Sequence, residues 1–151
     1  MVALSQLHSL AVYDIDGQLM TATALHSAMS KLVVKEHLVV HTNNLYPELF
    51  IDKPIKCRTS TSSCIPVSMP LVLPDDETGG VIVALIPTEI FANYFRQLHL
   101  SDDKLIVMTG TDGVIRTRQY RDQISSGGDL TNSSLFRTEL PKALSGRYHA
   151  V

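Results

Sequence analysis

Apolar residues and turn residues follow one design at two separate places in the chain. The segment 9–22 is apolar and β-prone on both sides of Asp16-Gly17. An Asp-Gly pair between two such runs predicts a hairpin, because glycine accepts the positive φ that tight turns require. Residues 106–117 align without gaps to residues 10–21 and place Asp112-Gly113 at the same point. Two hairpins of one design predict two copies of one module.

Two later stretches change to helical periodicity. Between residues 26 and 41, apolar positions such as Met29 and Val33 recur at spacings of three and four, with charged residues between them. This spacing predicts an amphipathic helix. Residues 87–100 repeat the pattern, and Pro87 stands where the first helical position is expected, which is a favoured place for proline.

The stretches between the helices predict strands and turns. We expect strands over residues 49–58, 64–73 and 81–86. The first two contain proline and are therefore expected to be irregular or to lie near sheet edges. Short turns join most of these strands, which predicts an α+β fold with an antiparallel sheet. After the second hairpin, residues 123–132 are expected to form a Ser/Gly-rich loop and residues 135–144 one short helix. The second module therefore appears in the sequence as a truncated copy.

Composition and charge narrow the classes of function. The chain has 151 residues, 44% of them hydrophobic and 19% charged, as expected for a globular chain. Its formal net charge is -2, which argues against nucleic-acid binding, because that function needs a clustered basic surface. The nearest approach to such a cluster is Arg116, Arg118 and Arg121, which we interpret as a solvated edge.

No targeting segment in this sequence indicates the compartment in which the protein acts. No apolar run approaches the roughly 18 residues that span a bilayer, and the first residues lack the features of a secretory signal. If the protein is exported, we expect the responsible segments to lie outside these residues. The two cysteines, Cys57 and Cys64, are too far apart for a CxxC motif. If a hairpin turns at residues 59–62, they fall opposite each other and a disulfide is feasible in an oxidising compartment; two reduced, half-buried cysteines are the alternative.

The order of these segments and their residue patterns resemble those of the double-Cache (PAS-like) family. Its members are sensors outside the membrane in bacterial receptors such as GGDEF-type diguanylate cyclases, histidine kinases and chemoreceptors. Four stretches carry the resemblance: the hairpin at 10–21, Glu36-His37-Leu38-Val39-Val40-His41, residues 49–58 running on to Ile65-Pro66-Val67-Ser68, and the strand-to-helix step at 81–91. Asp112-Gly113 then resembles the opening of the family's membrane-proximal module.

The resemblance implies a fold, a place and a task. It implies a membrane-distal Cache module over residues 1–100, with a central antiparallel sheet of about five strands flanked by helices. Residues 101–151 would be part of the proximal module. It further implies transmembrane helices outside this chain as the link to the membrane, a periplasmic location and signalling through a small-molecule ligand, and it is compatible with a homodimer.

The family's pocket assigns ligand contacts on the first helix and on three strands. On this chain the corresponding residues are Lys35, His37, His41, Arg58, Ser60, Ser63, Ser68 and Ile86. Members that bind amino acids carry an acidic residue near Ile86 and an aromatic residue near Ser63, and this sequence lacks both. A buried ammonium would lack a carboxylate partner, so we expect an organic acid and not an amine. Arg58 can hold a carboxylate through two parallel N–H bonds.

Other interpretations of the same residues remain open. Lys35 and Arg58 are equally well explained as solvated residues that bind no ligand. His37 and His41 have the spacing of metal ligands on a helix, but no third ligand is evident nearby, so we expect no metal and no cofactor. No catalytic motif is present, and we expect a sensor and not an enzyme. The alternatives are a cytoplasmic PAS- or GAF-like interaction domain without a ligand, and a small hydrolase that uses His37 or His41.

Overall fold

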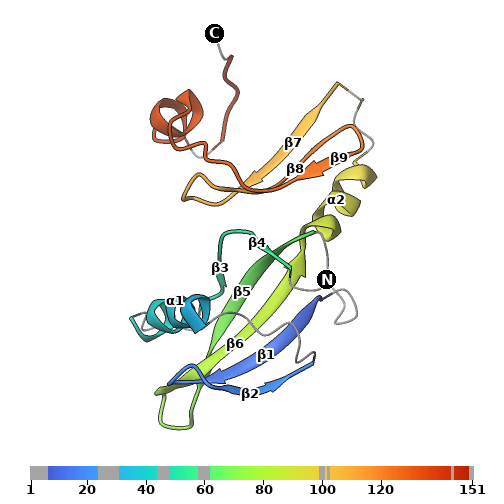
Figure 1. Cartoon of the computed structure of the whole chain (residues 1–151). Coiled ribbons are helices and arrows are strands. Elements are labelled where there is room, and N and C mark those ends of the chain that lie inside the picture. Colours follow the sequence, from blue (N-terminus) through green and yellow to red (C-terminus); the bar gives the residue numbers. More distant parts are fainter. Residues whose placement is uncertain are drawn as a thin grey trace. The chain divides into compact units, whose positions relative to one another are not determined.

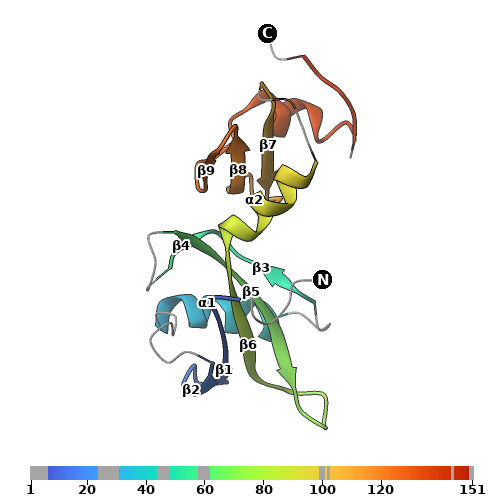
Figure 2. The same cartoon turned by 90° about the vertical axis from the view of Figure 1, so that its right-hand side faces the viewer.

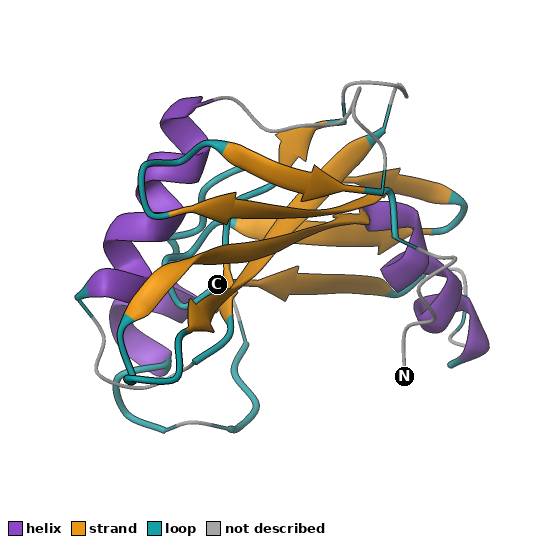
Figure 3. Cartoon of the chain, turned by 90° about the horizontal axis from the view of Figure 1, so that it is seen from below, coloured by secondary structure: helices purple, strands orange, loops and turns teal. Residues whose placement is uncertain are grey.

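The chain folds as two compact units. The structure, a computed structural model, describes residues 7–23, 31–43, 48–57, 62–98, 101, 103–143 and 145–149. Unit 1 comprises residues 1–90 and unit 2 comprises residues 91–151, and the division falls within helix α2 (Thr88–Gln97). Strands dominate both units (Figures 1 and 3).

Unit 1 is built on an antiparallel sheet with the strand order β2-β1-β6-β5-β3, and β4 also pairs with β5. The long strands β5 and β6 form its centre, and β1 pairs along β6 from Ser9 to Asp14. The strands are β1 (Ser9–Asp14), β2 (Leu19–Ala22), β3 (Phe50–Ile51), β4 (Ile55–Lys56), β5 (Ser63–Val72) and β6 (Thr78–Pro87).

Helix α1 (Lys31–Thr42) packs on one face of this sheet (Figure 2). Alternate residues of β1 are buried, as the period of two along a strand requires when one face is covered. Removing each large aliphatic side chain from water contributes about 1.5–3 kcal/mol. The core between helix and sheet consists of Ala11, Tyr13, Val34, Leu38, Val81 and Val83.

The α+β class with a central antiparallel sheet is confirmed, and two element boundaries are corrected. The single strand expected over 49–58 is wrong, because the chain leaves the sheet after Ile51 and returns at Ile55, past Pro54. Pro87 is the last residue of β6 and does not occupy the first helical position. Residues 24–30, where the first predicted helix would begin, lie outside the described part of the chain.

Unit 2 contains a three-stranded antiparallel sheet in the order β7-β8-β9. The strands are β7 (Leu105–Thr109), β8 (Ile115–Tyr120) and β9 (Gln123–Ser125). The prediction of a loop from residue 123 is wrong at its start, because Gln123 pairs with Tyr120 and extends the sheet. The expected short helix is a single π-helical turn, η3 (Leu135–Glu139).

The two predicted hairpins have the same backbone design. In the first, the amide of Asp14 donates to Gln18, and in the second the amide of Gly110 donates to Val114. Both central glycines have a φ of 76°. The register shifts by one residue between Val12 and Tyr13 and at the equivalent point of β7. The weak sequence repeat therefore reflects a repeated turn structure.

Within the described residues, no helix combines the length and the apolar character that crossing a membrane requires.

Candidate functional site

Two histidines on one face of α1 are buried against the sheet of unit 1. His37 is 0% exposed and His41 is 2% exposed, although histidines on a polar helix are usually found at the surface. Residues four apart lie above one another on a helix, so both side chains reach the same strand. That strand is β5, at the centre of the sheet.

Ser68 of β5 joins the two rings. Its Oγ lies 2.6 Å from Nδ1 of His37 and 2.8 Å from Nε2 of His41, and the serine is fully buried. Both distances are short for a hydroxyl between two imidazoles, which indicates well-formed hydrogen bonds. We call His37, His41, Ser68 and Asp52 the histidine cluster.

Strand β3 brings the fourth member of the cluster. Phe50 pairs with Ser68 in the sheet, and the backbone amide of Asp52 donates to the carbonyl of Pro66 at 2.9 Å. The carboxylate oxygen Oδ2 of Asp52 then lies 3.3 Å from Nε2 of His37. The ring of Phe50 meets both imidazoles edge-on, at centroid distances of 5.2 and 6.5 Å, and so fixes their planes.

The cluster has two consistent arrangements of its protons. A hydroxyl donates one hydrogen bond, and a neutral imidazole has one donor and one acceptor nitrogen. With a proton on Nε2 of His37 facing Asp52, the Ser68 hydroxyl donates to His37 and accepts from Nε2 of His41, so Nδ1 of His41 is a bare acceptor. When His37 gains a proton, the hydroxyl turns and donates to His41, and Nδ1 of His41 becomes a donor. Among the described residues this buried Nδ1 has no hydrogen-bond partner.

Electrostatics disfavour a positive charge on His41. Burial lowers the pKa of His41 below its ordinary value, and repulsion by His37 lowers this pKa further, while the hydrogen bond with Ser68 acts in the opposite direction. His37 has the carboxylate of Asp52 beside it, and His41 has no such partner in the described structure. The neutral form of His41 is therefore favoured in the folded chain.

The structure separates the remaining predicted ligand residues from the cluster. Lys35 is exposed on α1 and lines a cavity of about 420 Å³ with the turn at Asp16-Gly17. Ile86 pairs with Ile65, and because Ser68 pairs with Val83, the alternation of β6 places Ile86 on the opposite face of the sheet. The structure therefore does not bring Lys35 or Ile86 together with the histidines.

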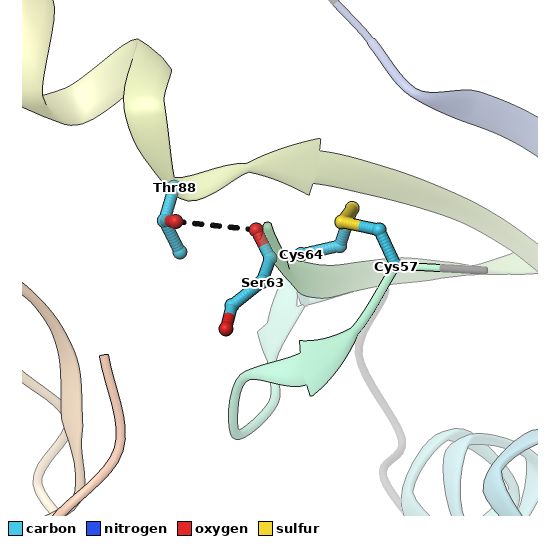
Figure 4. The surroundings of a disulfide bond; sticks show 4 residues. All are labelled: Cys57, Ser63, Cys64 and Thr88. Atoms are coloured by element: carbon cyan, nitrogen blue, oxygen red, sulfur yellow. Dashed lines mark hydrogen bonds between the residues drawn. A yellow bond between two sulfur atoms is a disulfide. The ribbon is translucent and has the colours of Figure 1, made fainter. Parts of the chain in front are cut away.

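Two further predicted contacts are placed elsewhere or lie outside the described residues. Ser63 is half-buried at the start of β5, where its carbonyl accepts a hydrogen bond from Oγ1 of Thr88 at 3.2 Å (Figure 4). Arg58 and Ser60 lie outside the described residues. Of the eight predicted residues, the structure thus brings together His37, His41 and Ser68.

Cys57 and Cys64 form a disulfide beside this end of β5 (Figure 4). Their Cα atoms are 5.3 Å apart and both residues are buried. The register differs from the predicted one, because Cys64 lies opposite Ile55 and the amide of Cys57 donates to the carbonyl of Ser62. The disulfide ties the short strand β4 to the centre of the sheet.

The half-buried carboxylate of Asp52 and the ring of Phe50 were missed by the sequence interpretation. Both lie in the stretch Phe50-Ile51-Asp52, where an acid one residue past an apolar pair carries no pattern of its own. The signal that existed was the alternation of β3, since Phe50 and Asp52 fall on one face of an extended chain.

The geometry favours neither a hydrolase at the histidine cluster nor a metal site beside the disulfide. Ser68, His37 and Asp52 stand in the order of a nucleophile, base and acid, but Ser68 is fully buried and its oxygen is held by a second histidine. His8 lies close to both cysteines, as a metal site would require, but the sulfurs are bonded to each other. What the cluster can do is exchange a proton and present a donor or an acceptor at His41.

Comparisons with known proteins point to one class of domain. No protein-family model matches the chain, and no curated protein sequence matches it. Among solved structures, the extracellular domain of rpHK1S-Z16, described as a histidine kinase, matches with a TM-score of 0.75 and 29% sequence identity. The match covers 92% of this chain and 57% of that domain, so the chain spans a little over half of its length. The chain therefore resembles an extracytoplasmic sensor domain of a membrane receptor.

Proposed function

We propose that this chain is the extracytoplasmic sensing region of a bacterial membrane receptor. The observation that carries the proposal is the likeness over 92% of the chain to the extracellular domain of a histidine kinase. The buried disulfide between Cys57 and Cys64 supports the same compartment, because disulfides persist in oxidising surroundings. A periplasmic location follows as part of the proposal.

We further propose that the two units are Cache-type modules. The repeated hairpin supports this, since the turns at Asp16-Gly17 and Asp112-Gly113 share the φ of the glycine, a backbone hydrogen bond and a register shift. The membrane-distal module would take residues 1–100 and the proximal module would begin in residues 101–151. The receptor's output domain would be a histidine kinase or a diguanylate cyclase, and a homodimer would carry the signal.

The ligand that suits the histidine cluster is a small anion. An organic acid that accepts a hydrogen bond from Nδ1 of His41 stabilises the arrangement in which His37 is protonated. A cation or a protonated amine would be repelled by the positive charge of that arrangement. Ligand binding and proton uptake are therefore coupled, because each favours the same orientation of the Ser68 hydroxyl. Signalling would follow from the resulting shift in how α1 packs on β5.

Calorimetric titration of the chain with a panel of carboxylates and amines tests the proposal. We expect an organic acid to bind, with a Kd that falls as the pH is lowered from 8 to 6. Titration in buffers that differ in ionisation enthalpy should show proton uptake. Binding of amines alone would contradict the anionic ligand, and no binding across the panel would favour a purely structural role.

Matched substitutions place the ligand. His41→Gln keeps a polar atom near the position of Nε2 but removes Nδ1, and we expect it to weaken binding at least tenfold, the effect of losing about 1.4 kcal/mol. Lys35→Gln, on the exposed side of the same helix, serves as the control and should leave the Kd within twofold. Equal loss in both variants would place the ligand away from the histidine cluster.

A further inference from the structure

Unit 2 contains a small cavity in which basic side chains gather. It has a volume of about 160 Å³ and is lined by Arg96, Lys104 and Arg121 together with Ser101, Gln119 and Asp122. At about 30 Å³ per water molecule, this volume suits a ligand the size of a few waters and is smaller than the pockets that hold drug-sized molecules. The lining has three cationic groups and one carboxylate, in a chain whose formal net charge is -2.

Sheet pairing brings two of the cations together from distant positions. Leu105 pairs with Tyr120 at the end of the β7–β8 ladder, so Lys104 and Arg121 are the next residues on each side. Like charges placed opposite each other at such a position are destabilising unless something compensates them. Arg96 reaches the same cavity from the last turn of α2.

The charges of this cavity are poorly compensated within the described residues. Arg96 bonds to the amide oxygen of Asn93, and the guanidinium of Arg121 lies over the ring of Tyr120 at 5.2 Å. Neither arginine forms an ion pair with any carboxylate that the structure describes. Among the residues that the structure describes, Lys104 forms an ion pair only with the exposed Asp103, at 3.7 Å. Such exposed pairs contribute little, so the cavity retains an excess of positive charge.

The backbone of Arg121 is held in an unfavourable conformation. Arg121 has a φ of 53° in the two-residue loop between β8 and β9, at the first loop position, where glycine is preferred. The side-chain amide of Gln119 donates to the carbonyl of Arg121 at 2.9 Å and fixes this loop. Keeping an arginine at a position better suited to glycine points to a use for its side chain.

The side-chain oxygen of Gln119 narrows the chemical class of the ligand that suits the cavity. Gln119 lines the cavity, and its Oε1 is buried without a hydrogen-bond partner among the residues described. A carbonyl-type oxygen requires a donor, which a fully deprotonated anion does not supply. A ligand with anionic oxygens and one hydroxyl satisfies both the guanidinium groups and this oxygen.

We propose that unit 2 binds a small hydroxylated dianion, of the type of hydrogen phosphate or a short hydroxy-dicarboxylate, in this cavity. The arginines and Lys104 hold the anionic oxygens, and Gln119 accepts from the hydroxyl. This site is separate from the histidine cluster in sequence and in unit, so it goes beyond the sensing function proposed above.

Titration of the isotope-labelled chain with sodium phosphate, and in parallel with malate, followed by NMR at constant ionic strength, tests the proposal. We expect saturable shifts in the amides of residues 104–106 and 119–123, with those of α1 unmoved. Sodium chloride at matched ionic strength should produce no saturable shift. Shifts confined to α1 and β5, or none at millimolar ligand, would overturn the proposal while leaving the function of unit 1 untouched.

Three variants identify the side chains. Arg121→Gln should weaken binding at least tenfold, whereas Arg118→Gln, an exposed change on β8, should leave it unchanged. Arg121→Gly removes the cation and relieves the loop, so it should raise the melting temperature of unit 2 and still abolish binding. Equal affinities of the Arg118 and Arg121 variants, or retained binding in Arg121→Gly, would refute the assignment.

Discussion

Acidification should destabilise unit 1 through His41. The pKa of this histidine is lowered in the folded chain from its ordinary value of 6.5, first by burial and then by repulsion from His37. A histidine whose folded-state pKa is lowered binds its proton more readily in the unfolded state. The stability it contributes is therefore present above about pH 6.5 and is lost as the pH falls below it.

The loss of stability on acidification is limited by the uptake of one proton at His41 and depends on the groups around that histidine. The slope cannot exceed about 1.4 kcal/mol per pH unit for one group, so the loss between pH 6.5 and 5 is at most about 2 kcal/mol. The second charge is costly because Ser68 would face two N–H donors while its own hydrogen loses its acceptor. Asp52, the carboxylate of the cluster, already compensates His37.

Hydrogen exchange detected by mass spectrometry gives the stability of unit 1 separately from unit 2. The amides of α1 and β5 report on the cluster once the rates are corrected for the intrinsic pH dependence of exchange. We expect their protection to fall between pH 7 and 5. In His41→Gln it should be lower by about 1 kcal/mol at neutral pH, through the altered hydrogen bond, and then nearly independent of pH.

The matched control is His149→Gln, which removes an exposed histidine of unit 2. It should leave the acid dependence of α1 and β5 as in the parent chain. Protection that stays constant from pH 8 to 5 in the parent chain would refute the reasoning. So would a His41→Gln variant that loses stability on acidification as steeply as the parent, because the responsible proton would then bind elsewhere.

Three further predictions concern stability. Reduction of the Cys57–Cys64 disulfide should lower the free energy of unfolding of unit 1 by about 2 kcal/mol, because the unfolded chain is no longer constrained by the closed loop. Urea unfolding with and without dithiol measures this, and an unchanged midpoint would contradict it. Arg116→Gln should destabilise unit 2 by about 1–3 kcal/mol, because it breaks the bidentate ion pair with Asp112, in which the arginine is only 6% exposed. Hydrogen-exchange protection of the β8 amides measures the loss, and unchanged protection would count against the prediction. Gly113→Ala should be more harmful than Gly17→Ala, since both need a φ of 76° but only the former places Cβ 2.6 Å from a neighbouring side chain; equal melting-temperature losses would argue against the close packing.

Arg116, Arg118 and Arg121, in β8 and the loop after it, show how far a local pattern can be trusted. From the sequence we interpret these three arginines as a solvated edge, but each has a different environment in the structure. Arg116 is buried against Asp112, Arg118 is exposed and bonded to Ser125, and Arg121 lines a cavity. Alternation along the strand separates neighbouring side chains, but which face is covered depends on segments elsewhere in the chain.

The local elements were determined by the sequence itself. Asp-Gly turns, the apolar run of β6 and the helical spacing of α1 follow from backbone sterics and periodicity, which act over a few residues. For this reason both hairpins, the antiparallel class and the closeness of Cys57 and Cys64 were accessible without coordinates. The boundaries at Pro54 and Pro87 were not, because a proline is accepted in a strand or at a helix start according to the pairing around it.

The chemistry of the site was decided by tertiary structure. His37 and His41 were visible as a pair, but only the pairing of β3 with β5 brings Asp52 and Ser68 to them from distant parts of the chain. Lys35 lies away from the pair because residues two apart on a helix face different sides. Ile86 lies away from it because the β5–β6 register places Ile86 on the other face of the sheet. Burial then lowered the pKa of His41, a property that depends on how much water the surrounding sheet excludes and that no single residue encodes.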